Sequence, residues 1–123
     1  VLAMMKLTGP SVGASNADIT FLSSSHEVGR QVVEELDREP WGISCAHTFA
    51  ESRAEQNRRK MAFFLGRPSV KATTLHSFKG WEARMLVLHL GTAMSSENMA
   101  ATYAAITRLK RDPAGSFLTV VCS

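Results

Sequence analysis

Short apolar segments alternate along this chain with longer segments that have the spacing of amphipathic helices. The clearest is Arg84–Leu90 (RMLVLHL), a nearly unbroken apolar run typical of a strand buried on both faces. Four more strands are predicted at 18–23, 42–47, 70–74 and 117–122. Helices are predicted at about 24–39, 51–65 and 96–109. Because strands and helices alternate, we expect an α/β domain whose mainly parallel sheet is covered by helices on both faces.

The first predicted helix has clear start and stop signals. Ser24 and Glu27 have the spacing of a capping box, and Pro40 ends the helical pattern. One apolar stripe along this helix would face the sheet and consists of Val28, Val32 and Leu36.

The second predicted helix repeats the capping-box spacing at Thr48 and Glu51. We expect it to direct three apolar residues toward the core, namely Ala54, Met61 and Leu65. Its outer face would carry a basic triplet, Arg58, Arg59 and Lys60. The triplet is either a solvated helix face or part of a surface for a polyanion.

Composition excludes several classes of protein. The 123 residues are 45% hydrophobic and 20% charged, which is typical of one globular domain and not of a disordered chain. No apolar run approaches the ~18 residues that span a bilayer, so no membrane partner is expected. Cys45 and Cys122 are too far apart for a metal or disulfide framework. We therefore expect no metal ligands here and a reducing, cytoplasmic location.

Charge is distributed unevenly between the two halves of the chain. Residues 1–57 carry four basic and eight acidic side chains, whereas residues 58–123 carry ten basic and three acidic ones. This asymmetry favours a polyanion, either a nucleotide or a nucleic acid, as the partner of the second half.

One polar segment, Thr73–Glu82 (TTLHSFKGWE), joins the third and fourth predicted strands in too few residues for a covering helix. Ligands of parallel α/β sheets bind at the carboxyl ends of the strands. Hydroxyls and backbone N–H groups suit phosphate oxygens, and a carboxylate suits ribose hydroxyls. We therefore predict a tight functional loop here.

A second polar segment is Thr102–Arg111, in and after the last predicted helix. We expect Tyr103 and Ile106 on the core side of that helix. Arg108 would lie near its C-terminus, where a cation complements the helix dipole. The alternative is that Arg108 is directed at a phosphate, for which its planar fork and permanent charge are suited.

These two segments resemble conserved motifs of one helicase family. Thr74–Glu82 resembles motif V of UvrD/Rep-type superfamily 1 helicases, T-x-H-S-x-K-G-x-E, and Tyr103–Arg108 (YAAITR) resembles motif VI, Y-V-A-hydrophobic-T-R. The resemblance covers about residues 18–123. It implies a second RecA-like (P-loop NTPase-like) three-layer motor domain that closes over ATP on a first motor domain of the same chain. Residues 1–17 are predicted separately, from their glycine, proline, serine and asparagine content, to be a loop or entry segment.

The resemblance also implies a role for each matching residue. Arg108 would be the catalytic arginine that reaches the γ-phosphate across the cleft. The nucleotide would further be bound by Lys79, Gly80 and Glu82, with Lys79 able to serve the DNA instead. Single-stranded DNA would be contacted by Thr74, His76 and Ser77.

Several parts of such a motor are missing from this sequence. It contains no G-x-x-x-x-G-K-[ST] loop, no Asp-Glu pair for Mg²⁺ and no asparagine-tyrosine-arginine-serine segment of motif IV. In an intact helicase these would precede Val1, so ATP with Mg²⁺ would be bound jointly and the isolated chain would be inactive. Two alternatives stay open: a non-catalytic helicase-like module that binds nucleotide or nucleic acid or regulates a partner, and an unrelated enzyme that uses His76 or Cys45.

Overall fold

The computed structural model describes Val1 and residues 15–49, 52–64, 69–78 and 80–123, with only the backbone described for 60–64. Five strands form one sheet in the order β2-β3-β1-β4-β5, and every pairing is parallel. The strands are β1 (Ile19–Ser23), β2 (Ala46–His47), β3 (Lys71–Thr74), β4 (Met85–Leu90) and β5 (Phe117–Cys122). The predicted parallel α/β architecture is therefore confirmed, although β2 is shorter than predicted.

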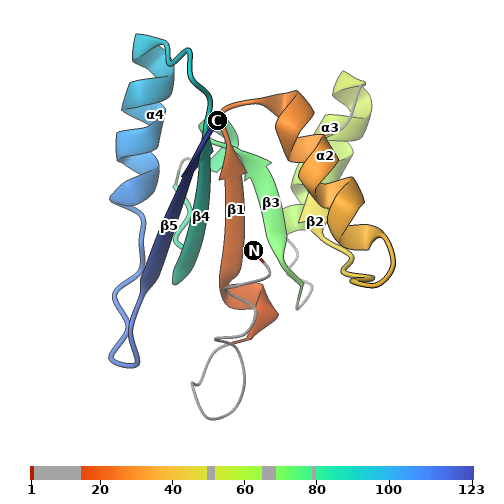
Figure 1. Ribbon diagram of the computed structural model, residues 1–123, viewed down its shortest axis with the longest axis horizontal. Helices are drawn as coiled ribbons and strands as arrows, with labels where there is room; N and C mark the ends of the chain where they lie inside the picture. The colour runs from red at the N-terminus through yellow and green to blue at the C-terminus, as the bar shows by residue number, and fades with distance from the viewer. Residues whose placement is uncertain (2–14, 50–51, 65–68, 79) are drawn as a thin grey trace.

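Helices cover the two faces of this sheet. They are α2 (His26–Asp37), α3 (Arg53–Phe64) and α4 (Ser96–Ile106), with two short 3-10 helices, η1 (Asn16–Asp18) and η2 (His76–Phe78). Figure 1 shows α2 and α3 on one side of the sheet and α4 on the other. The loop predicted over 1–17 lies mostly outside the described residues, and its described end contains η1.

Two separate cores form because successive strand residues point to opposite faces of the sheet. On the α2 side, Phe21 and Val87 pack with Val33 of α2 and with Phe49. On the α4 side the core contains Leu22, Leu86, Leu88, Ala101 and Ala105, among others. The stripe predicted for the first helix faces the sheet, with Leu36 buried and Val28 and Val32 half-buried.

The predicted cap of the first helix is wrong by one residue. Ser25 is the N-cap of α2, and its hydroxyl accepts a hydrogen bond from the N–H of Val28 at 3.3 Å. Ser24 instead accepts the N–H of Gly91 at 2.9 Å. The hydroxyl of Ser24 thereby links the end of β1 to the end of β4.

The cap predicted for the second helix, Thr48, is also wrong. Thr48 is buried, and its Oγ1 lies 2.6 Å from Oγ1 of Thr73 on β3. The helix begins later, where the Ser52 hydroxyl accepts the N–H of Glu55 at 3.1 Å. The burial of Thr48 in the sheet leaves its hydroxyl unavailable to a helix end.

Of the three residues of this helix predicted to face the core, Ala54 is exposed, so the prediction is wrong for that residue. The side chains of Met61 and Leu65, and the whole of Glu51, lie outside the described residues.

The helix α4 presents a different face to the core from the one predicted. Tyr103 is 73% exposed and Ile106 39% exposed, whereas Ala101 and Ala105 are buried. Small residues let a helix approach its neighbours closely, so the alanines face η2 and the sheet and the larger side chains point to solvent. The expectation that Tyr103 and Ile106 lie on the core side is therefore wrong.

The last strand, β5, is found where it was predicted but lies at the edge of the sheet. Its apolar side chains Leu118, Val120 and Val121 are all exposed. No helix in the described part of the chain is long and apolar enough to cross a lipid bilayer.

Candidate functional site

The polar segment after β3 connects the two ends of the sheet. It leaves the carboxyl end of β3 at Thr74, forms η2, and reaches the amino end of β4 through Glu82. The predicted tight loop thus contains a short 3-10 helix, with Phe78 buried in the α4-side core. Its two ends therefore lie at opposite ends of the strands. We call the side where the strands end the carboxyl edge and the side where they begin the amino edge.

Three of the predicted site residues gather at the carboxyl edge. The hydroxyl of Thr74 donates to Oγ of Ser77 at 3.0 Å and accepts the N–H of Ser77 at 3.3 Å. The exposed His76 has its Nε2 atom 3.0 Å from Oδ1 of Asn98, in the first turn of α4. Beside them is an open groove of about 540 Å³, lined by His76, Glu97, Ala100, Ala101 and Ala104.

The predicted nucleotide residues gather instead at the amino end of β4. Gly80 is exposed and has a φ of +84°, a left-handed conformation that side chains disfavour. The N–H of Ala83 donates to the carbonyl of Arg108 at 3.2 Å, which fixes the chain after α4 beside Glu82. Lys79 lies outside the described residues.

The side chains of Glu82 and Arg108 are both exposed, and neither has an ion-pair or hydrogen-bond partner within the described ranges. The Glu82 carboxylate accepts hydrogen bonds, and the Arg108 guanidinium is a permanently charged donor. Together they suit a ligand that carries both hydroxyl groups and an anionic group.

The helix α4 connects the two groups of residues. His76 contacts its first turn, and Arg108 follows its C-terminal residue, Ile106. Eleven helical residues span about 16 Å at about 1.5 Å per residue. The backbones of His76 and Arg108 therefore lie toward opposite ends of α4, whereas the Arg108 side chain lines a small cavity with Leu75, Phe78 and Ala104.

A divalent cation has no evident ligand set in this part of the chain. The described residues hold no group of three or more His, Cys, Asp or Glu side chains that could bind a metal ion. The carboxylate of Glu82 and the guanidinium of Arg108 are chemically compatible with the hydroxyl and phosphate groups of a nucleotide.

The basic triplet on α3 is only in part a solvated helix face, because Arg58 is exposed whereas Arg59 is half-buried and lies against His47. Arg58 and Arg59 both form ion pairs with Glu55, the latter at 2.9 Å. Arg58 also lowers the pKa of the Glu55 carboxyl, chiefly through their hydrogen bond. The side chain of Lys60 is outside the described residues.

The alternative of an enzyme built on Cys45 finds no support in the geometry. Burial, together with the nearby charge of Asp37, raises the pKa of the Cys45 thiol to about 11. Its Sγ atom contacts the carbonyl of Ile43 at 3.9 Å. A thiol of this kind is protonated at neutral pH and is a poor nucleophile.

Sequence reasoning missed a buried histidine at the carboxyl edge. The ring of His89 lies between two hydroxyls, with Nδ1 3.0 Å from Ser23 Oγ and Nε2 2.7 Å from Ser123 Oγ. These contacts join the ends of β1, β4 and β5. The available signal was a polar residue, His89, inside the apolar stretch MLVLHL.

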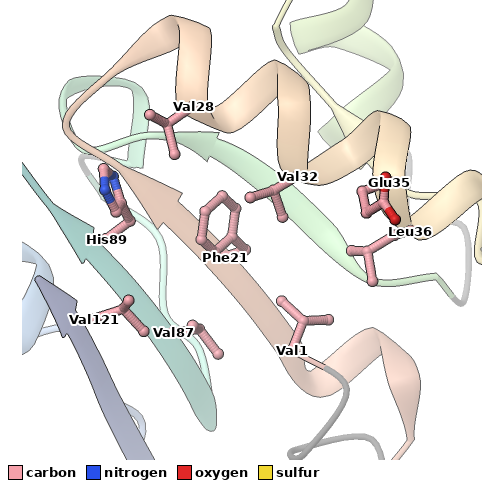
Figure 2. Close-up of a pocket in the computed structure, with 9 residues that line it drawn as sticks. All are labelled: Val1, Phe21, Val28, Val32, Glu35, Leu36, Val87, His89 and Val121. Atoms are coloured by element: carbon pink, nitrogen blue, oxygen red, sulfur yellow. The ribbon is translucent and has the colours of Figure 1, made fainter. Parts of the chain in front are cut away.

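The largely apolar groove in Figure 2 lies between α2 and the strands β1, β4 and β5 and has a volume of about 410 Å³. His89 is at one end and Glu35 at the other. The remaining lining is Val1, Phe21, Val28, Val32, Leu36, Val87 and Val121. This apolar lining does not suit a phosphate, so we place the candidate site on the other side of the sheet.

Comparisons with known proteins support the fold. No protein-family model matches the sequence, and no curated protein matches it. Among solved structures, the chain is similar to the C-terminal domain of the DEAD-box protein Dbp5, with a TM-score of 0.59. The two share 19% sequence identity over 98% of this chain and 67% of the other.

The five-stranded parallel sheet and this likeness show that the chain has the α/β fold of a RecA-like domain, as found in helicase motors. DEAD-box proteins belong to superfamily 2, so the likeness concerns the fold that the helicase superfamilies share.

Proposed function

We propose that this chain is the second motor domain of an ATP-dependent DNA helicase or translocase of the UvrD/Rep type. The observation that carries this proposal is the pair of unpartnered side chains, Glu82 and Arg108, on two segments joined by the Ala83–Arg108 backbone hydrogen bond. A first RecA-like domain of the same protein would supply the phosphate-binding loop and the Mg²⁺ ligands.

In this proposal Arg108 is the catalytic residue. Its guanidinium neutralises negative charge that develops on the transferring γ-phosphoryl group, an effect worth about 10³–10⁵ in rate in related systems. Glu82 accepts hydrogen bonds from the ribose hydroxyls. The left-handed Gly80 lets the backbone approach the nucleotide, and Lys79 provides a further cation.

Single-stranded DNA would bind at the opposite edge, on Thr74, His76 and Ser77. Ser77 Oγ accepts the Thr74 hydroxyl, so its own proton is available to a phosphate oxygen. The hydrogen bond between His76 and Asn98 connects this edge to α4, which carries Arg108 beyond its far end. A movement of α4 would thereby couple the state of ATP to the position of the DNA.

The test is ATP hydrolysis by the intact protein that joins this domain to its first motor domain. Arg108→Ala should lower the DNA-stimulated rate by about 10³ or more and leave DNA affinity mostly unchanged, because in this proposal Arg108 contacts ATP and not DNA. His76→Ala should weaken the stimulation of ATP hydrolysis by DNA more than it lowers the rate of hydrolysis without DNA.

Wild-type hydrolysis by a folded Arg108→Ala protein would contradict this function and favour the non-catalytic module. Equal loss of hydrolysis and DNA binding in that variant would indicate misfolding, which circular dichroism of the same sample would detect.

A further inference from the structure

Arg84 immediately precedes β4 and is only 5% exposed, although it is cationic. Its Nε–H donates to the carbonyl of Gly115 at 2.8 Å, and the same atom lies 3.8 Å from Oδ1 of Asp112. A buried charge is tolerated only when it is paired and hydrogen-bonded. The Gly115 carbonyl and the Asp112 carboxylate therefore offset part of the cost of burying this guanidinium.

The partners belong to one tight turn after α4. Oδ1 of Asp112 accepts the N–H of Ala114 at 2.8 Å, and the carbonyl of Asp112 accepts the N–H of Gly115 at 2.9 Å. Gly115 has a φ of +103°, which other residues rarely adopt. The turn is thus shaped to bring one carbonyl and one carboxylate to Arg84.

The same stretch of chain carries Arg108. The N–H of Ala83 donates to the Arg108 carbonyl at 3.2 Å, and the N–H of Lys110 donates to the Ala83 carbonyl at 2.7 Å. Beyond the turn, the N–H of Phe117 donates to the Arg84 carbonyl at 3.0 Å. Residues 82–84 and 108–117 therefore lie side by side, and the Arg84 side chain is their buried link.

We propose that Arg84 is a positioning residue, whose guanidinium holds the chain after α4 against β4 and so fixes Arg108 relative to Glu82. The inference rests on the proposed function of Arg108 and Glu82. Positioning matters because a displacement of about 1 Å in a catalytic group costs up to about 10² in rate. Arginine suits this place because its guanidinium stays charged and is weakly hydrated, whereas a buried lysine readily loses its proton.

The first test is hydrogen exchange on the 123-residue chain. Arg84→Lys should accelerate exchange of the Lys110 and Phe117 amides by about tenfold or more, the effect of losing a hydrogen bond from a charged donor. The matched control is Arg38→Lys, which changes an exposed arginine paired with Glu35 at 3.2 Å and should leave those amides unchanged.

If Arg84→Lys does not fold, Asp112→Asn replaces it, since the amide keeps the oxygen that accepts the Ala114 N–H and loses the charge facing Arg84. Unchanged exchange in a folded variant overturns the proposal.

The second test is ATP hydrolysis by the intact protein. Arg84→Lys should lower kcat by about tenfold or more at unchanged affinity for single-stranded DNA. In an Arg108→Lys background it should cause a much smaller further loss, because residues that act through one another are not additive.

The outcomes separate the two proposals. Wild-type kcat for Arg84→Lys beside an inactive Arg108→Ala overturns the positioning role alone. The same loss in both backgrounds also overturns it, since that indicates a merely structural role. A fully active Arg108→Ala overturns the proposed function and this inference with it.

Discussion

Gly29 illustrates how one residue determines the packing of a helix. It is buried on α2, directly beneath the ring of Phe49. A methyl group added at this position would lie 2.3 Å from Cε1 and from Cζ of that ring. The absence of a side chain at Gly29 is therefore what allows α2 and the segment after β2 to lie this close.

We predict that Gly29→Ala destabilises the domain. Alanine favours a helix over glycine by about 1 kcal/mol, but overpacking of a buried ring costs about 1–3 kcal/mol and outweighs it. The measurement is the urea midpoint of unfolding. Gln31→Ala, at an exposed position of α2, is the control and should change the midpoint little.

A higher midpoint for Gly29→Ala would mean that the Phe49 ring can move aside. The double variant with Phe49→Leu distinguishes the two cases, because the smaller side chain relieves the clash only if a clash exists.

At the scale of elements, β2 and α3 are joined through a histidine. Nε2 of His47 lies 3.2 Å from Nη1 of Arg59, and the ring stacks on Phe49 with centroids 6.3 Å apart. Burial, and then the charge of Arg59, lower the pKa of His47 below its usual 6.5, against smaller opposite effects of Glu34 and Glu55. The folded protein therefore prefers the neutral imidazole.

This preference predicts a pH dependence of stability. Because the pKa is lower in the folded state, the contribution is fully present above the unfolded pKa of 6.5 and is lost as the pH falls through the folded value. We expect the urea midpoint of unfolding to decrease as the pH is lowered from about 7 to about 5. His47→Gln should flatten this part of the profile, and an unaltered profile would show that His47 does not contribute.

At the scale of the whole molecule, the residues proposed to bind DNA and those proposed to bind nucleotide all belong to the basic half of the chain. Residues 58–123 carry ten basic and three acidic side chains. Contacts between such a surface and DNA phosphates release counterions, so binding weakens as salt rises. Figure 1 shows α4 on the side of the sheet opposite α2 and α3, running from the carboxyl ends of the strands toward their amino ends.

We predict that the isolated chain binds single-stranded DNA weakly and that its affinity falls between about 50 and about 200 mM salt. Fluorescence anisotropy of a labelled oligonucleotide measures the affinity and its dependence on salt concentration. His76→Ala should lower the affinity with little change in the salt slope, because that slope reports the lysines and arginines that neutralise phosphates and none of these is removed. Affinity that is independent of salt would exclude the electrostatic part of the DNA proposal.

The sequence by itself determined the number, type and order of the main elements. The run RMLVLHL and the alternation around it are local patterns, and local patterns suffice because strand and helix periodicities are properties of the backbone. The two polar segments could also be found in advance, since their residue types and spacing are written in the chain.

Only the tertiary structure decided which face of each element is buried. Tyr103 and Ile106 fit the helical period of a core stripe, but the close approach of α4 to η2 selected Ala101 and Ala105. The Thr48 hydroxyl likewise pairs with Thr73 across strands and caps no helix. Such outcomes depend on partners distant in sequence, and for the same reason the link from Arg84 to the segment that carries Arg108 could not be predicted from the sequence.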